Sequence, residues 1–164
     1  MSMKQLCKTS ILIDTKPLCL LLIGLVDQEY ICKFDRTKEF TINDFKKLTS
    51  FLKNYSSFST THYILCEAMY FTAENKNLKP IYKDRIYKIV TSLLHRYSDF
   101  DQTPNTEIIF ESNCINIVGT SDCSLLEASR SNDIPFLTSD LVLYSQASRN
   151  KVDAFHFLPV VGVC

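Results

Sequence analysis

Short apolar runs that end in an acidic residue recur along this chain, and they constrain its fold more than any other feature. Three such runs are followed by an acid: 10–13 by Asp14, 63–66 by Glu67, and 134–138, after one serine, by Asp140. Runs of this length are typical of buried strands, and helix-like segments separate them. Strands that alternate with helices favour a mostly parallel sheet. The predicted fold class is therefore α/β, a three-layer α/β/α sandwich with a mostly parallel central sheet.

The segments between these runs have apolar residues at helical spacing. Thr41 offers a helix cap with Asp44 three residues later, so a helix with an apolar face is predicted to follow. Helices are expected over 18–26, 42–54, 68–74, 84–97, 104–111 and 141–149. Residues 115–118 fit either a strand or a helix, and a closing strand is expected over 154–161.

Length and charge limit what the chain can do. Its 164 residues fit one domain, expected over 1–164, and the 46% apolar content is enough for a packed core. Eighteen basic and eighteen acidic residues give no net charge, so no global positive field would hold nucleic acid. Any contact with nucleic acid is therefore expected to be local.

The cysteines and the N-terminal region indicate the cellular compartment in which the protein is expected. The seven cysteines include no C-x-x-C pair and are odd in number, which favours reduced, buried thiols over a disulfide framework or a zinc site. The apolar stretch 18–26 is preceded by Lys16 and Pro17 and is far shorter than the roughly 20 residues that cross a bilayer. We expect a cytoplasmic protein without a signal peptide or a membrane span.

A fourth acid completes the pattern, because Asp122 lies in the first turn of a helix predicted after 119–121. Acids that follow parallel strands share one edge of the sheet, so all four carboxylates can converge there. Carboxylates that close together need shared protons or a cation. Oxygen ligands without histidine or cysteine favour Mg²⁺ or Mn²⁺ over zinc, and such a site suits phosphodiester hydrolysis. Any one of these acids alone is more often a helix cap or a solvated loop residue.

Four stretches around the acids resemble the PIN domain family, whose members are metal-dependent ribonucleases and include the toxins of VapC-type toxin-antitoxin pairs. The matching stretches are 11–15, 61–67, 119–122 and 136–140. The resemblance covers nearly the whole chain, and it implies an endoribonuclease that binds one or two Mg²⁺ or Mn²⁺ ions. The ligands that it implies are Asp14, Glu67, Asp122 and Asp140. A further stretch, 30–45 with its core at 34–40, is similar to one in a bacterial subgroup of the family.

The resemblance also implies supporting residues. Thr15, Ser121 and Thr138 carry hydroxyls beside the acids and would orient a carboxylate or water, although caps and turns use the same residues. Lys16 departs from the family, because many PIN proteins carry asparagine after the Asp-Thr pair. Three roles stay open for Lys16: contact with the scissile phosphate, replacement of one cation, or exposure to solvent.

RNA is the expected substrate, and the resemblance implies a small antitoxin protein and a homodimer as further partners, with no membrane contact. Four basic residues of the helix expected over 84–97 and its N-terminal flank either guide RNA or form a solvated face: Lys83, Arg85, Lys88 and Arg96. No histidine has the spacing of a ligand, so structural or surface roles are expected for His62, His95 and His156.

Two alternatives remain at this stage. The first keeps the fold without strong catalysis, as a PIN-like scaffold or RNA-binding module weakened by Lys16. The second is a phosphoaspartyl phosphatase of the haloacid dehalogenase type with Asp14 as nucleophile. The second aspartate that such enzymes carry two residues later is Lys16 here.

Overall fold

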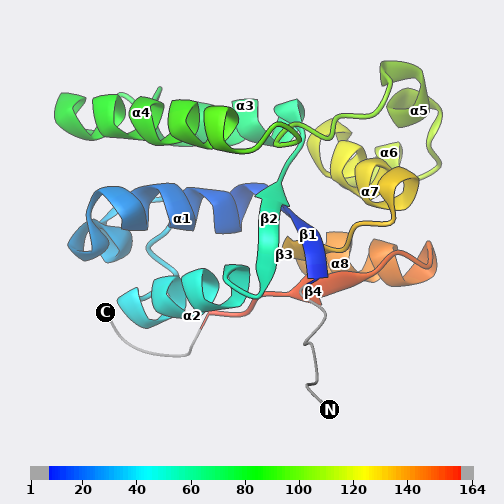
Figure 1. Ribbon diagram of the computed structural model, residues 1–164, viewed down its shortest axis with the longest axis horizontal. Helices are drawn as coiled ribbons and strands as arrows, with labels where there is room; N and C mark the ends of the chain where they lie inside the picture. Colours follow the sequence, from blue (N-terminus) through cyan, green and yellow to red (C-terminus); the bar gives the residue numbers. More distant parts are fainter. Residues whose placement is uncertain (1–7, 160–164) are drawn as a thin grey trace, which may run out of the picture.

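The core of the molecule is a parallel sheet with the strand order β2-β1-β3-β4. The computed structural model describes residues 8–159 (Figure 1). The strands are β1 (Lys8–Ile13), β2 (Tyr55–Ser59), β3 (Phe136–Thr138) and β4 (Ala154–His156). All three strand pairs are parallel, and Leu12 of β1 lies opposite Ser59 of β2 and Phe136 of β3. The predicted α/β class with a parallel sheet is confirmed.

Helices cover the sheet in two layers (Figure 1). Helices α1 and α2 pack together on one face, while α7 and α8 pack together on the other. Helix α3 contacts both α1 and α7, and α4 lies along α1. The helices are α1 (Thr15–Val26), the 3₁₀ helix η1 (Gln28–Lys33), α2 (Ile42–Leu52), α3 (His62–Phe71), α4 (Pro80–Arg96), α5 (Thr106–Glu111), α6 (Ile115–Val118), α7 (Thr120–Asn132) and α8 (Leu141–Arg149). This arrangement is the predicted α/β/α sandwich.

Helix α1 is the central helix of the core. Its residues from Pro17 to Gly24 are buried, as are Ile11, Leu12 and Ile13 of the strand before it. A helix that is apolar on nearly all sides needs protein on nearly all sides, which explains the uninterrupted apolar stretch in the sequence. No helix in the described part of the chain is long and apolar enough to span a bilayer.

The cap predicted for α2 is present. The Thr41 hydroxyl accepts a hydrogen bond from the Asp44 N–H, and the Asp44 carboxylate accepts one from the Thr41 N–H at 2.7 Å. This reciprocal pair satisfies two backbone donors that the first turn of a helix leaves without partners. The helix begins at Ile42 as expected and ends at Leu52, two residues before the predicted end.

The strand expected over 63–66 is wrong. These residues lie inside α3, and the strand before them is β2, which the sequence pattern did not indicate. The Thr61 hydroxyl accepts from the Ile64 N–H, which starts a helix, and Ile64 and Ala68 are buried one turn apart. A short apolar run cannot be assigned to strand or helix from periodicity alone. Here the Thr61 cap favours the helix.

Other boundaries also differ from the predictions, since α4 begins at Pro80 and not at residue 84, and one ambiguity is resolved. The closing strand β4 ends at His156, so residues 157–159 are not strand, and residues 160–161 of that prediction lie outside the described residues. The helix expected over 68–74 is the end of α3, which stops at Phe71. Residues 115–118 form helix α6.

The expectation of reduced, buried cysteines holds only in part. Cys19, Cys114 and Cys123 are free and buried. Cys66 is free but exposed, because it lies on the solvent side of α3 and not in a strand. Cys32 is disulfide-bonded, so the expectation is wrong for that residue.

Gly24 of α1 lies directly against Phe45 of α2. A Cβ at this position would lie 2.2 Å from Cδ2 of the buried Phe45 ring. We predict that Gly24→Ala lowers the free energy of unfolding by roughly 1–3 kcal/mol, although alanine favours a helix by about 1 kcal/mol. Urea unfolding measures this change. Phe45→Leu in the Gly24→Ala background should recover part of the loss, and a stabilised Gly24→Ala protein would contradict this packing.

Candidate active site

The candidate site lies at the carboxyl ends of β1 and β3, the two central strands. The chain leaves β1 through α1 and α2 toward β2, and it leaves β3 through α8 toward β4 on the other face. The strand order therefore reverses between β1 and β3, where parallel sheets of this kind open a crevice for ligands. Asp14 follows β1 directly, and Asp140 follows β3 after one residue.

Asp14 is the most tightly held of the four acids. It is buried and caps α1, and its Oδ1 accepts a hydrogen bond from the Thr15 N–H at 2.6 Å. The Thr138 hydroxyl donates to its Oδ2, also at 2.6 Å. The Asp14 N–H donates to the Leu137 carbonyl at 3.0 Å, which ties the acid to β3. The carboxylate is therefore fixed from both central strands.

Glu67 reaches the site from a helix and not from a strand end. It lies in α3, and its Oε2 accepts a hydrogen bond from the Thr15 hydroxyl at 2.6 Å. Thr15 thus contacts two acids, with its N–H on Asp14 and its hydroxyl on Glu67. The sequence pattern placed Glu67 directly after a strand, and that element is wrong because residues 63–66 belong to the same helix.

Asp122 lies in the first turn of α7, as predicted. Two hydroxyls fix this turn relative to α3, since Thr61 at the start of α3 and Ser124 of α7 share a hydrogen bond of 2.7 Å. Among the described residues, the Asp122 carboxylate accepts no hydrogen bond from the protein. Of the four acids, Asp122 therefore has the fewest hydrogen bonds to its carboxylate within the described residues.

Asp140 is both a helix cap and a member of the cluster. Its Oδ1 accepts hydrogen bonds from the N–H groups of Val142 and Leu143 at 2.7 and 2.9 Å. Its own N–H donates to the Thr138 hydroxyl at 2.9 Å, and that hydroxyl in turn donates to Asp14. The capping role that the sequence allowed is real, and it orients the carboxylate beside the other acids.

Electrostatics couple the four acids. Burial raises the pKa of Asp14 to about 6, against two hydrogen bonds that lower it, and the charges of Asp140 and Glu67 raise it further. Burial also raises the pKa of Asp122 to about 8, and the charges of Asp14, Asp140 and Glu67 add to this rise. Mutual repulsion of this kind indicates that the four carboxylates lie near one another. Carboxylate oxygens are the ligands that hard divalent cations prefer, and a bound cation would offset the repulsion.

The supporting residues divide into two groups. Thr15 and Thr138 contact the acids directly, as their sequence positions predicted. The Ser121 carbonyl accepts a hydrogen bond from the Ser124 hydroxyl, and within the described residues its own hydroxyl contacts none of the acids. Lys16 lies on the exposed side of α1 with its Nζ 2.9 Å from Glu39 Oε1. That ion pair agrees with the solvent-facing role among the three left open for Lys16.

Sequence reasoning missed the hydroxyls at the end of β2. The Thr60 hydroxyl donates to the Ile13 carbonyl at 2.9 Å, directly before Asp14, and Thr61 links α3 to α7. Both threonines are buried. The sequence signal is three consecutive hydroxyl residues, 59–61, before an apolar run.

The histidines and the basic residues of α4 have local contacts. His62 Nδ1 lies 3.6 Å from Asp101, and His156 stacks on Tyr144. Lys88 pairs with Asp84 of the same helix at 2.8 Å. The Arg96 guanidinium lies 5.6 Å from the ring centroid of the neighbouring Tyr97. These contacts fit the structural and surface roles that the sequence left open for these residues.

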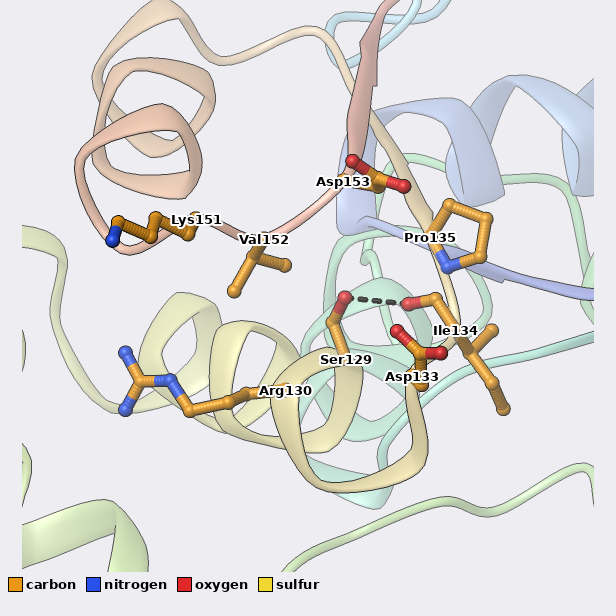
Figure 2. Close-up of a pocket in the computed structure, with 8 residues that line it drawn as sticks. All are labelled: Ser129, Arg130, Asp133, Ile134, Pro135, Lys151, Val152 and Asp153. Atoms are coloured by element: carbon orange, nitrogen blue, oxygen red, sulfur yellow. Dashed lines mark hydrogen bonds between the residues drawn. The ribbon is translucent and has the colours of Figure 1, made fainter.

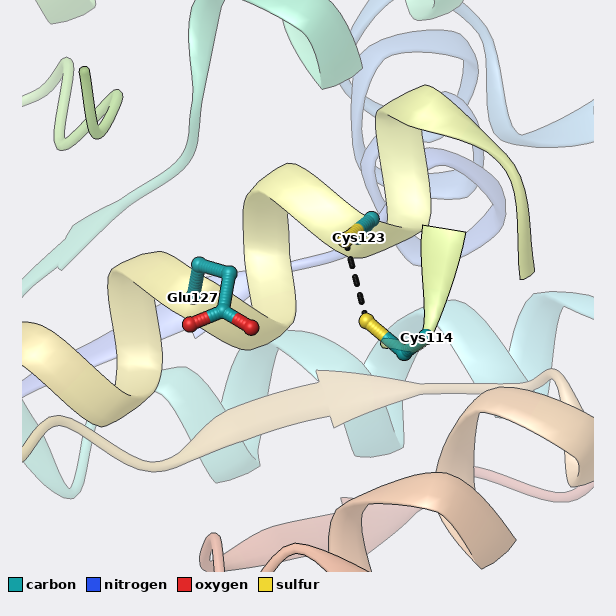
Figure 3. Close-up of side chains that lie close together, drawn as sticks. All are labelled: Cys114, Cys123 and Glu127. Atoms are coloured by element: carbon teal, nitrogen blue, oxygen red, sulfur yellow. Dashed lines mark hydrogen bonds between the residues drawn. The ribbon is translucent and has the colours of Figure 1, made fainter. Parts of the chain in front are cut away.

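A second polar cluster lies behind Asp122, inside the layer of α5 to α7. Figure 3 shows Cys123 and Glu127 of α7 beside Cys114, with the two Sγ atoms 2.9 Å apart. Glu127 is already satisfied, because both of its oxygens accept from Arg130 and one accepts from Ser112. Thiolate ligands of one zinc ion stand farther apart, and burial raises the pKa of Cys123 to about 12. This cluster therefore packs the turn before α6 onto α7 and supports the position of Asp122.

A pocket lies at the opposite edge of the sheet. Figure 2 shows residues from the end of α7 and from the segments before β3 and β4, with Asp133 and Asp153 on one side and Arg130 and Lys151 on the other. Pro135 and Asp153 directly precede their strands, so this pocket is at the amino ends of strands whose carboxyl ends carry the acids. The pocket and the acid cluster are separate sites.

Comparisons with known proteins leave the activity open. No family model and no curated protein matches the chain. A solved structure with a similar arrangement is a domain of a functionally unknown protein from Methanocaldococcus jannaschii DSM 2661. It is 15% identical in sequence with a TM-score of 0.48, and the match covers 94% of each chain.

The raised pKa values predict a pH dependence of stability without a cation. Both aspartates have folded pKa values above the ordinary value of 3.8, so the folded state holds more protons than the unfolded state at pH values between roughly 4 and 8. The free energy of unfolding in EDTA should therefore fall as the pH rises through this range. Urea unfolding at pH 5, 6.5 and 8 measures the change.

Asp122→Asn isolates the contribution of one acid, because asparagine has no proton to lose. This variant should lose less stability than the wild type between pH 6 and 8. Asp99→Asn, at an exposed position, serves as the matched control and should follow the wild type. Identical pH profiles for the wild type and Asp122→Asn would contradict the raised pKa.

Proposed function

We propose that this protein is an endoribonuclease that depends on Mg²⁺ or Mn²⁺ and uses Asp14, Glu67, Asp122 and Asp140 as metal ligands. The observation that supports the proposal most strongly is the hydrogen-bond network at the crevice between β1 and β3, in which Thr15 contacts Asp14 and Glu67 and Thr138 contacts Asp14 and Asp140. Within the described residues none of the four acids is in an ion pair, and a bound divalent ion would offset their mutual repulsion. Their order along the chain and the resemblance to PIN domains support RNA as the substrate.

One or two divalent ions, when bound, would polarise a phosphate and activate water for hydrolysis. The protein contributes fixed ligands, since Thr15 and Thr138 hold Asp14 and Glu67 in place through hydrogen bonds of 2.6 Å. Asp140 is held by two backbone N–H groups. Asp122 must give up its proton before it can bind a cation, so metal affinity should rise with pH.

The same proposal includes a cytoplasmic location, a homodimer and a small antitoxin that would cover the acids. The homodimer and the antitoxin rest on the resemblance alone, and the location rests on the sequence pattern of the cysteines and the N-terminal stretch. The phosphoaspartyl alternative has less support, because Lys16 occupies the position of its second acid and pairs with Glu39. Both Asp14 oxygens also accept hydrogen bonds inside a buried site, which limits their use as a nucleophile.

The first test is the cleavage of structured and single-stranded RNA by the purified protein with Mg²⁺, with Mn²⁺ and with EDTA. We expect cleavage only with a cation. Asp14→Asn and Asp122→Asn should each reduce turnover by at least ~100-fold, because each removes a metal ligand. Asp99→Asn is the control for loss of a carboxylate and should cleave at the wild-type rate.

Calorimetry with Mn²⁺ separates the proposed enzyme from a weakened scaffold. Metal binding without cleavage of any RNA would support the PIN-like scaffold, and cleavage that persists in EDTA would contradict a metal mechanism. Wild-type turnover in both aspartate variants, with folding confirmed by circular dichroism, would overturn the site assignment.

A further inference from the structure

The segment 34–40 between η1 and α2 has no role in the acid cluster, yet it brings Arg36 close to it. The Arg36 guanidinium lies over the Phe71 ring of α3, with Cζ 3.6 Å from the ring centroid. Phe71 is one helical turn after Glu67, so the two side chains project on the same side of α3. Glu39 of the same segment pairs with Lys16 in the first turn of α1.

The charges that act on the buried Cys19 agree with this placement of Arg36. Cys19 lies on α1 one turn after Thr15, and burial is the main reason that its pKa rises to about 12. Among the charges that act on this thiol, Asp14 and Glu67 raise its pKa and Arg36 lowers it. The guanidinium therefore acts on the same buried position as two of the four acids.

Arg36 is free to bind a ligand. Its side chain is exposed, and no carboxylate or carbonyl among the described residues accepts a hydrogen bond from it. The acids beside it in the chain have other partners, since Asp35 pairs with Lys38 and Glu39 with Lys16. The guanidinium is held against the face of the Phe71 ring, a favourable cation–π position, and its N–H groups donate to no carboxylate among the described residues.

We infer that Arg36 binds a backbone phosphate of the RNA next to the one that is cleaved. This inference rests on the proposed function. Four carboxylates repel the substrate, so a fixed cation beside them offsets that repulsion for the flanking phosphate. The planar guanidinium binds phosphate through two parallel hydrogen bonds, which a lysine ammonium does not provide. Because the chain has no net charge, local cations must supply this contact.

The test compares Arg36→Gln, Arg36→Lys and Lys38→Gln in the full chain. Lys38 is the matched control, because it lies in the same segment, is exposed, and loses the same charge. Binding of a fluorescently labelled single-stranded RNA is measured by anisotropy in EDTA at several salt concentrations. We expect Arg36→Gln to weaken binding about tenfold and to reduce the slope of log affinity against log salt by about 0.7. Lys38→Gln should change neither quantity.

Arg36→Lys keeps the charge and should recover the salt slope but not the full affinity. In cleavage with Mn²⁺, Arg36→Gln should raise KM more than it lowers kcat, since the contact is away from the scissile bond. Equal losses in Arg36→Gln and Lys38→Gln, or wild-type binding by Arg36→Gln, would overturn the inference.

The outcomes also separate this inference from the proposed function. A wild-type protein that cleaves RNA, with Arg36→Gln unchanged in KM and salt slope, overturns the role of Arg36 alone. A wild-type protein that binds RNA through Arg36 without cleaving it overturns the nuclease and supports the binding contact. A wild-type protein that neither binds nor cleaves RNA overturns both.

Discussion

Repulsion among carboxylates at one edge of the sheet is the constraint on which the rest of the structure depends. Burial of Asp14 is unfavourable for its charged form, and the neighbouring acids add to that cost. The fold tolerates this arrangement because buried apolar residues anchor the chain on both sides of Asp14, with Ile11 to Ile13 before it and Leu18 to Ile23 after it.

Threonine hydroxyls connect the elements that carry the acids. Thr15 and Thr138 contact carboxylates, while Thr60 joins the end of β2 to the end of β1. A threonine is suited to this role, because its hydroxyl donates to an acid while its methyl group packs against apolar neighbours. The acid cluster is consequently rigid on its β1 and β3 side and least constrained at Asp122.

Features that depend on near neighbours in the chain could be predicted from the sequence. The reciprocal cap of Thr41 and Asp44, the position of Asp122 in a first turn, and the cap at Asp140 are local hydrogen-bonding patterns. The strand β2 was missed because three of its five residues are serine, and its place in the sheet depends on pairing with β1. The apolar run 63–66 was assigned to a strand because a short apolar run fits a strand and a buried helix equally well.

The sequence by itself determined the α/β class, the helix caps and the presence of acids at the ends of the central strands, because these follow from local pattern and spacing. Only the tertiary structure decided which side chains meet. Thr15 and Glu67, which are 52 residues apart in the sequence, share a hydrogen bond. Lys16 forms an ion pair with Glu39, and the Arg36 guanidinium lies over the Phe71 ring. Contacts between residues so far apart depend on how the helices pack on the sheet, and no local propensity encodes them.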